Sequence, residues 1–166
     1  MYRDALDTPY GVMHLAVDAS GVLIETWLPQ RGPNEVTLGA FPTAASDGMA
    51  LAKQQLREYF EGTRRTFDLQ LEARGSAFER SVWKKLLEIP YGEMTSYGAI
   101  AGALRLENGA RAVGAANGSN PIPIIIPCHR VIGSDGTLTG YGGGLPLKRA
   151  LLELEGAIPP PDPRLF

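Results

Sequence analysis

Apolar and polar residues alternate along the first part of the chain in a way that predicts β-strands. Residues 12–17 and 22–27 each form a short apolar run bounded by turn residues, which is typical of a β-hairpin. Residues 46–60 carry apolar side chains at helical spacing, and residues 67–71 alternate again. Residues 1–75 therefore predict a small α+β unit built from a hairpin, a helix and one further strand.

Helical spacing dominates the second part of the chain. Ser76 and Glu79 form a capping box, which predicts a helix that stops before Pro90. The rest of the pattern predicts helices at 97–104, 110–116 and 147–155, a buried strand at 122–126, and a proline-rich tail at 157–166 that lies over the surface. The fold class is therefore α+β, with a candidate domain boundary at 73–75 and a mainly helical C-terminal domain over 76–166.

The two short helices at 97–104 and 110–116 are joined by a glycine-containing turn, as in a helix-turn-helix. The second of them is almost entirely glycine and alanine apart from Arg111 and Val113. Such a smooth helix suits close contact with another helix, or with the floor of a DNA groove. It offers few donors for reading base edges, so DNA binding through it would be independent of sequence.

Charge and composition limit the possible functions. The 166 residues carry a formal net charge of -2, so the sequence does not indicate nucleic-acid binding through a large positively charged surface. Residues 1–75 hold 7 basic and 10 acidic residues and residues 76–166 hold 9 and 8, so any contact with phosphate belongs to the second part. No segment approaches the ~20 apolar residues of a membrane span, and the first residues lack the cationic-then-apolar pattern, so we expect no secretory signal.

The cysteine and histidine content argues against a metal centre and for a reducing compartment. A single cysteine excludes an internal disulfide and a cysteine-based zinc cluster, and two histidines make a dedicated metal site improbable. We therefore expect a cytoplasmic protein without a bound metal. The glycine-rich loop at 139–145 lacks the Lys-Ser/Thr of a phosphate-binding loop, so no nucleotide cofactor is expected.

The reactive side chains gather in one stretch. Cys128, His129 and Arg130 directly follow the apolar run and Pro127. A lone cysteine is often a small core residue, but an adjacent imidazole and guanidinium favour a nucleophile. Glu155 lies at the C-terminal end of the last predicted helix, where a carboxylate is unfavourable without a partner.

These residues carry a resemblance to a known family. Residues 127–131, Pro-Cys-His-Arg-Val, resemble the active-site motif of the O6-alkylguanine-DNA alkyltransferases, which repair DNA by accepting an alkyl group on their own cysteine. Further matching motifs, in the same order, are Ile-Pro-Tyr-Gly-Glu at 89–93, Ser-Tyr at 96–97, Ala-Arg-Ala-Val-Gly at 110–114, Asn-Pro at 120–121, Gly-Tyr-Gly-Gly-Gly at 140–144 and Leu-Leu-Glu-Leu-Glu-Gly at 151–156. The resemblance is strong over 76–156 and loose before it.

The resemblance implies a fold and a DNA-bound substrate. The first unit would be ribonuclease-H-like, and the helix-turn-helix would enter the minor groove of double-stranded DNA. Residues expected to touch DNA or the flipped base are Tyr97, Arg111, Ala112, Gly114, Val131, Tyr141 and Gly142. Arg111 would fill the space that the base leaves, Tyr97 would help rotate the nucleotide outward, and Gly142 would donate toward guanine O6.

The resemblance also implies a relay. Glu155 would orient His129, which would take the proton of Cys128 through a water molecule, while Asn120 would brace the turn. The expected substrate is chiefly O6-methylguanine, with O4-alkylthymine as a further lesion. The product is a thioether, so each molecule would act once, as a monomer, and without a cofactor.

Two alternatives stay open at this stage. A non-catalytic alkyltransferase-like protein would bind the lesion without reacting, although such proteins lack the cysteine. A Cys-His hydrolase would turn over many substrate molecules. The role of Arg130 is not explained by the motif, and we expect an ion pair that braces the domain interface.

Overall fold

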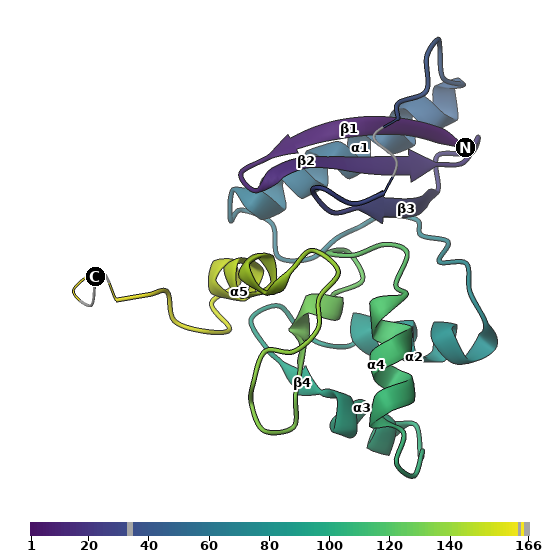
Figure 1. Ribbon diagram of the computed structural model, residues 1–166. Coiled ribbons are helices and arrows are strands. Elements are labelled where there is room, and N and C mark those ends of the chain that lie inside the picture. The colour runs from purple at the N-terminus through teal and green to yellow at the C-terminus, as the bar shows by residue number, and fades with distance from the viewer. Residues whose placement is uncertain (33–34, 163, 165–166) are drawn as a thin grey trace.

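The computed structural model describes residues 1–32, 35–162 and 164 (Figure 1). The chain begins with three strands, β1 (Tyr2–Thr8), β2 (Gly11–Val17) and β3 (Leu23–Trp27), which form an antiparallel sheet in that order. Helix α1 (Thr43–Phe60) follows and packs across one face of this sheet (Figure 1). Its buried residues Ala45, Met49, Ala52, Gln55, Leu56 and Tyr59 recur at helical spacing.

The predicted hairpin is present, but the sheet has a strand that the sequence pattern did not indicate. β1 pairs with β2 along its whole length, from Tyr2 opposite Val17 to Thr8 opposite Gly11. Only Leu6 of this strand is fully buried, so β1 shows no clear apolar alternation and its partner determines its conformation. The predicted strand at 67–71 is wrong, because only Leu71 makes an isolated bridge, to Leu23.

The second part of the chain is mainly helical. It contains α2 (Ala77–Leu87), α3 (Tyr97–Ala103), α4 (Ala110–Gly118), the short 3-10 helix η1 (Cys128–Arg130) and α5 (Leu145–Leu154), with β4 (Thr95–Ser96) parallel to β5 (Val131–Ile132). The predicted capping box at α2 is confirmed: the Ser76 hydroxyl accepts from Glu79 N, and the Glu79 carboxylate accepts from Ser76 N.

The predicted strand at 122–126 is wrong. This segment makes a turn in which Ile126 N donates to Ile122 O at 2.9 Å, and Ile124 has a positive φ of 77°. All the isoleucines in it are buried, and a short apolar run alone does not separate a buried strand from a buried turn. Cys128 therefore lies in a 3-10 turn, not at the end of a strand.

Helix ends differ slightly from the prediction, and the tail differs more. α1 and α5 begin three and two residues early, and α4 continues to Gly118. The segment after α5 leads away from the body in Figure 1, so the part of the tail that the structure describes does not cover the surface.

One apolar core runs through both parts of the chain. It includes Leu15 and Tyr59 from the first part and Ile126, Val131 and Leu151 from the second. Thr26 at the end of the sheet joins the two parts, because its amide donates to Pro121 O and its hydroxyl to Pro123 O, both at 3.0 Å. Within the described residues, no helix is both long and apolar enough to cross a membrane.

Candidate active site

A pocket of about 400 Å³ opens where the sheet, α4 and the glycine-rich loop meet. The side chain of Cys128 reaches it, although this residue is only 5% exposed. The pocket is lined by Thr26, Trp27, Leu28, Arg31, Tyr97, Gly114, Asn117, Gly118, Asn120, Pro123, Cys128, Gly140, Tyr141 and Gly142. Its wall therefore combines residues from the first and the second part of the chain.

Two asparagines hold the backbone around Cys128. Asn120 Nδ2 donates to Ile126 O at 2.8 Å, and its Oδ1 accepts from Ile122 N at 3.0 Å, so this side chain spans the turn that precedes the cysteine. Asn117 Nδ2 donates to the carbonyl of Cys128 at 3.3 Å. Together with the bond from Cys128 N to Ile126 O at 2.8 Å, these contacts hold the backbone from which the Cys128 side chain projects.

The thiol of Cys128 is not activated by its surroundings at rest. Burial raises its pKa to about 11, and this outweighs the Asn120 amide and the Lys148 ammonium, which both lower it. A thiolate is the reactive form of cysteine. Nucleophilic attack by Cys128 would therefore require a base that takes the proton of the thiol.

His129 is the neighbouring base, and its environment keeps it neutral. Burial lowers its pKa, more than the hydrogen bond to Glu155 raises it, and the charges of Arg130 and Lys148 lower it further. His129 Nε2 lies 2.8 Å from Glu155 Oε2, so Nε2 carries the proton and donates. The other nitrogen, Nδ1, is then the acceptor, and no described residue donates to it.

Glu155 is the centre of a buried cluster of donors. Tyr59 Oη donates to Glu155 Oε2 at 2.6 Å, and Arg130 donates from Nε to Oε1 at 2.8 Å and from Nη2 to Oε2 at 3.0 Å. Burial alone would raise the pKa of Glu155, but the bonds from His129, Arg130 and Tyr59 lower it to about 2. The carboxylate is thus ionised, and its position at the C-cap of α5 is compensated.

Arg130 forms an ion pair, as expected, although not across the predicted domain boundary. Its partner Glu155 lies in the same part of the chain, and its Nη1 also donates to Ile89 O at 2.7 Å. The guanidinium lies over the ring of Tyr91, 5.7 Å from the centroid. Arg130 therefore ties η1 to the ends of α2 and α5.

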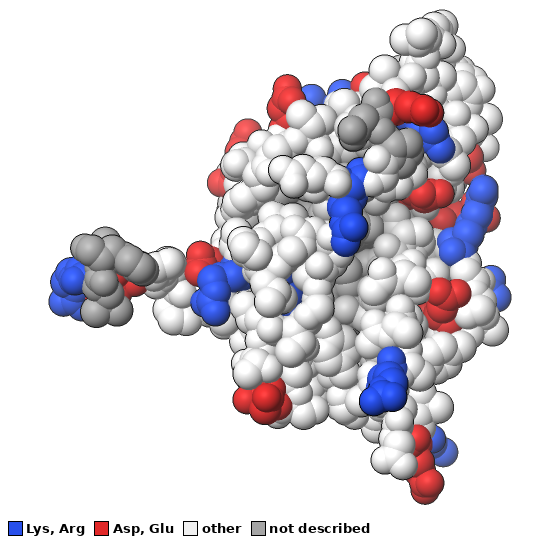
Figure 2. Space-filling view, viewed as in Figure 1, with Lys and Arg blue, Asp and Glu red and all other residues white. Residues whose placement is uncertain are grey.

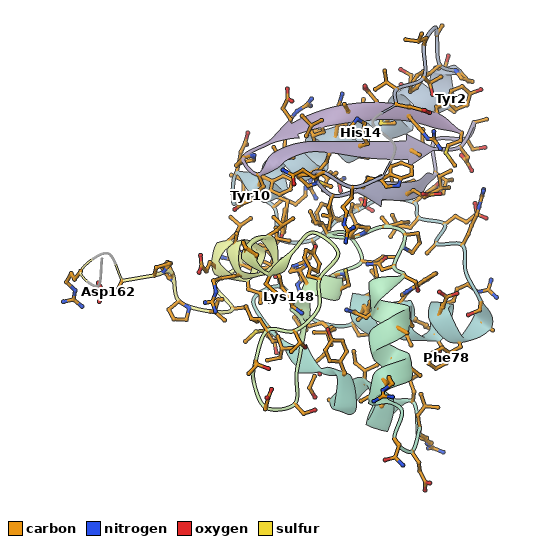
Figure 3. The ribbon with its side chains drawn as sticks, in the orientation of Figure 1. Tyr2, Tyr10, His14, Phe78, Lys148 and Asp162 are labelled. Carbon is orange, nitrogen blue, oxygen red and sulfur yellow. The ribbon has the colours of Figure 1, made fainter. Side chains whose placement is uncertain are left out.

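Lys148 is a buried residue that the sequence pattern did not single out. Its ammonium donates to the carbonyls of Val131 at 2.5 Å, Thr139 at 2.9 Å and Gly140 at 3.3 Å, and Figure 3 shows it between α5 and the loop before this helix. Burial lowers its pKa to about 8. Lys148 lies three and four positions before Leu151 and Leu152, and this helical spacing places it on the apolar face of α5. That spacing was the one feature of the sequence that could have predicted its burial.

The remaining predicted site residues divide into two groups. Tyr97, Gly114, Tyr141 and Gly142 line the pocket with Cys128, and the Tyr97 hydroxyl donates to Thr139 O at 2.9 Å. Arg111 and Ala112 lie on the exposed side of α4, outside the pocket. Two of the predicted residues also use their backbone carbonyls within the protein: Val131 O accepts from Lys148 Nζ, and Gly142 O accepts from Arg31 Nε.

Besides Lys148, the site contains residues that the sequence reasoning missed. Tyr59 contacts Glu155 from α1, Asn117 contacts Cys128 from α4, and Trp27 of β3 lines the pocket. Asn117 shares the buried face of α4 with Val113, which is a helical-spacing signal. For Tyr59 and Trp27 no local signal exists, because packing across the two parts brings them to the site.

Comparison with known proteins agrees with this architecture. Residues 77–157 match the model of the DNA-binding domain of 6-O-methylguanine DNA methyltransferase. Methylated-DNA–protein-cysteine methyltransferases from Mycolicibacterium paratuberculosis and Methanosarcina barkeri are 55% and 45% identical to the chain. They align with 99% and 93% of this chain and with 98% and 97% of their own lengths. The crystal structure of Mycobacterium tuberculosis OGT in complex with DNA is 45% identical. It superimposes with a TM-score of 0.83 and covers 95% of this chain and 94% of its own.

The fold and the cysteine site define a protein of the alkyl-accepting DNA-repair class. Sequence identity of 48% and 55% to relatives over 99% of the chain also identifies the family within this class. The chain belongs to the methylated-DNA–protein-cysteine methyltransferase family.

Proposed function

We propose that the protein repairs DNA by transferring the alkyl group of O6-alkylguanine, chiefly O6-methylguanine and also O4-alkylthymine, irreversibly to Cys128. Membership of the family supports the reaction class. The observation that carries the assignment to this site is the buried Cys128 at the pocket, followed by a neutral His129 that Glu155 orients. A protein that only bound the lesion would need neither the thiol nor this base.

The chemistry follows from the cluster. With a pKa of about 11, the thiol of Cys128 is protonated at rest. His129 Nδ1 takes this proton through a water molecule and so generates the reactive thiolate. The sulfur attacks the alkyl carbon, the carbon–O6 bond breaks, and its electron pair stays on guanine. Guanine regains one proton, which balances the one lost by the thiol. Donors at O6, including the amide of Gly142, favour departure of the base.

The substrate base has to leave the duplex to reach this pocket, at a cost of a few kcal/mol. α3 and α4 act as the helix-turn-helix, and α4 enters the minor groove. The packing of α3 against α4 and the small, exposed side chains of α4 support this role. Figure 2 shows mainly uncharged atoms over α4 with isolated basic and acidic side chains, which suits local contact more than a broad electrostatic grip.

The finer structural assignments are part of the same proposal. The order β1-β2-β3-α1 supports a ribonuclease-H-like first unit, with the domain division at residue 75. The protein acts as a monomer in the cytoplasm, binds DNA largely without regard to sequence, and uses Tyr97, Ala112, Gly114, Val131 and Tyr141 around the flipped base.

Arg111→Ala is expected to slow repair of duplex DNA about 10- to 100-fold, because nothing then fills the space left by the base. The reaction with free O6-benzylguanine should stay within about twofold, since the free base needs no extrusion. Arg57→Ala, which removes an exposed arginine of α1, is the matched control and should change neither rate. Equal losses on duplex and free base would contradict the role of Arg111.

The reaction itself is tested by mass spectrometry after the protein is mixed with a duplex that contains O6-methylguanine. We expect a gain of about 14 Da, the mass of one CH2 group, localised to Cys128 and limited to one group per molecule. Cys128→Ser should gain no mass. Unmodified wild-type protein that still binds the duplex would refute alkyl transfer and support a lesion-binding protein. Continuous product release from an ester would support a hydrolase.

A further inference from the structure

The ring of Tyr59 packs among other aromatic rings. It is fully buried on α1, and its ring packs against Phe60, Phe67 and Tyr91 with centroid distances of 5.3, 5.5 and 6.3 Å. A phenylalanine would make the same ring contacts. Packing in the core therefore does not explain the hydroxyl.

The hydroxyl instead binds the carboxylate at the proposed relay. Its oxygen lies 2.6 Å from Glu155 Oε2, the same atom that accepts from His129 Nε2 at 2.8 Å. A buried phenol without a partner is destabilising, so the Tyr59 hydroxyl stays against Glu155, and the bond holds the end of this carboxylate in place. Tyr59 thus brings α1 into contact with the cluster behind Cys128.

Tyr59 is the donor in this bond. Burial raises its pKa well above the ordinary value, and the nearby charge of Glu155 raises it further, so the phenol keeps its proton. Glu155, with a pKa of about 2, is ionised and can only accept.

We propose that Tyr59 is a positioning residue for alkyl transfer: its hydroxyl holds the Glu155 carboxylate against His129 and limits the negative charge that this carboxylate presents to the imidazole. The inference rests on the proposed function of the Cys128 site. It gives the first unit of the chain a direct part in the reaction, in addition to its part in the core.

The expected effect has a definite sign. Without the hydroxyl, Oε2 loses one donor, and the carboxylate stabilises the protonated imidazole more strongly. The pKa of His129 then rises toward neutral pH, so less of the neutral base is present at pH 7. The other groups that face His129 and Glu155 stay in place: Arg130 and Cys128 from η1, Lys148 from α5, Tyr91 after α2 and Tyr141 from the glycine-rich loop.

The test is Tyr59→Phe, measured as single-turnover transfer from free O6-benzylguanine and from the alkylated duplex between pH 5 and 9. The low-pH limb of the rate profile should move up by about half a pH unit, so the rate on that limb should fall about threefold and the rate at pH 7 by less. Both substrates should respond alike, because the cluster acts on the thiol and not on DNA. Histidine ring NMR should show the same upward shift for His129, since the chain has only two histidines.

Tyr10→Phe is the matched control, because its ring also packs against Phe60, with 5.8 Å between the centroids, but the residue is exposed and lies outside the cluster around Glu155. It should leave the pH profile in place. A Tyr59→Phe profile and a His129 titration that match those of wild type would overturn the inference, even if its melting temperature fell, since a purely structural role lowers stability alone. Failure of wild-type protein to accept the alkyl group would overturn the proposed function, and the His129 titration would still decide the contact of Tyr59.

Discussion

Glu155→Gln is expected to slow alkyl transfer by roughly 10²–10⁴-fold, the range for loss of a general base or of its correct tautomer. The new side-chain amide can donate to His129 Nε2 while its oxygen faces Arg130. His129 then carries its proton on Nδ1, the atom that we propose accepts the proton of Cys128. Single-turnover transfer from the alkylated duplex measures the effect, and Glu153→Gln on the same helix is the control. A Glu155→Gln rate equal to that of wild type would remove Glu155 from the relay.

The same variant has a pH signature in stability. The folded-state pKa of Glu155, about 2, lies below the ordinary value, so its ionisation stabilises the fold above about pH 4.5. This contribution is lost as the pH falls toward 2. The difference in free energy of unfolding between wild type and Glu155→Gln should therefore shrink from pH 6 to pH 3 in urea titrations. A constant difference would show that the carboxylate gains nothing from its donors.

Arg130→Met is expected to lower the free energy of unfolding by about 3–5 kcal/mol, the usual cost of leaving one partner of a buried ion pair alone. Glu155 would keep Tyr59 and His129 as donors but lose two bonds from the guanidinium, and Ile89 O would lose its partner. Urea unfolding at pH 7 measures the loss. Arg149→Met, which replaces an exposed arginine on α5, should stay within about 0.5 kcal/mol of wild type.

A double-mutant cycle separates the ion pair from other effects of Arg130. When position 155 already carries glutamine, Arg130→Met should cost clearly less than it does in wild type, since no buried carboxylate is left unpaired. Additive losses would mean that Arg130 stabilises the fold through Ile89 and Tyr91 alone.

Local interactions account for what could be predicted correctly about the fold. The capping box of Ser76 and Glu79 and the turn between β2 and β3 depend on residues within a few positions of each other, so the sequence specifies them directly. The errors have a common cause. β1 depends on pairing with β2, and the turn at 122–126 depends on its bond from Asn120 and on burial from all sides. A local pattern of apolar residues contains no information about such contacts.

By itself, the sequence determined the reactive group of this protein, because Cys128, His129 and Arg130 are adjacent and the family motif surrounds them. Only the tertiary structure decided how that group is controlled. Glu155 receives donors from α1 and η1, and Lys148 is buried among backbone carbonyls. The pKa values of Cys128 and His129 follow from burial. These properties arise because packing removes water and brings distant residues together. Neither burial nor such long-range contacts can be predicted from the spacing of residues along the chain.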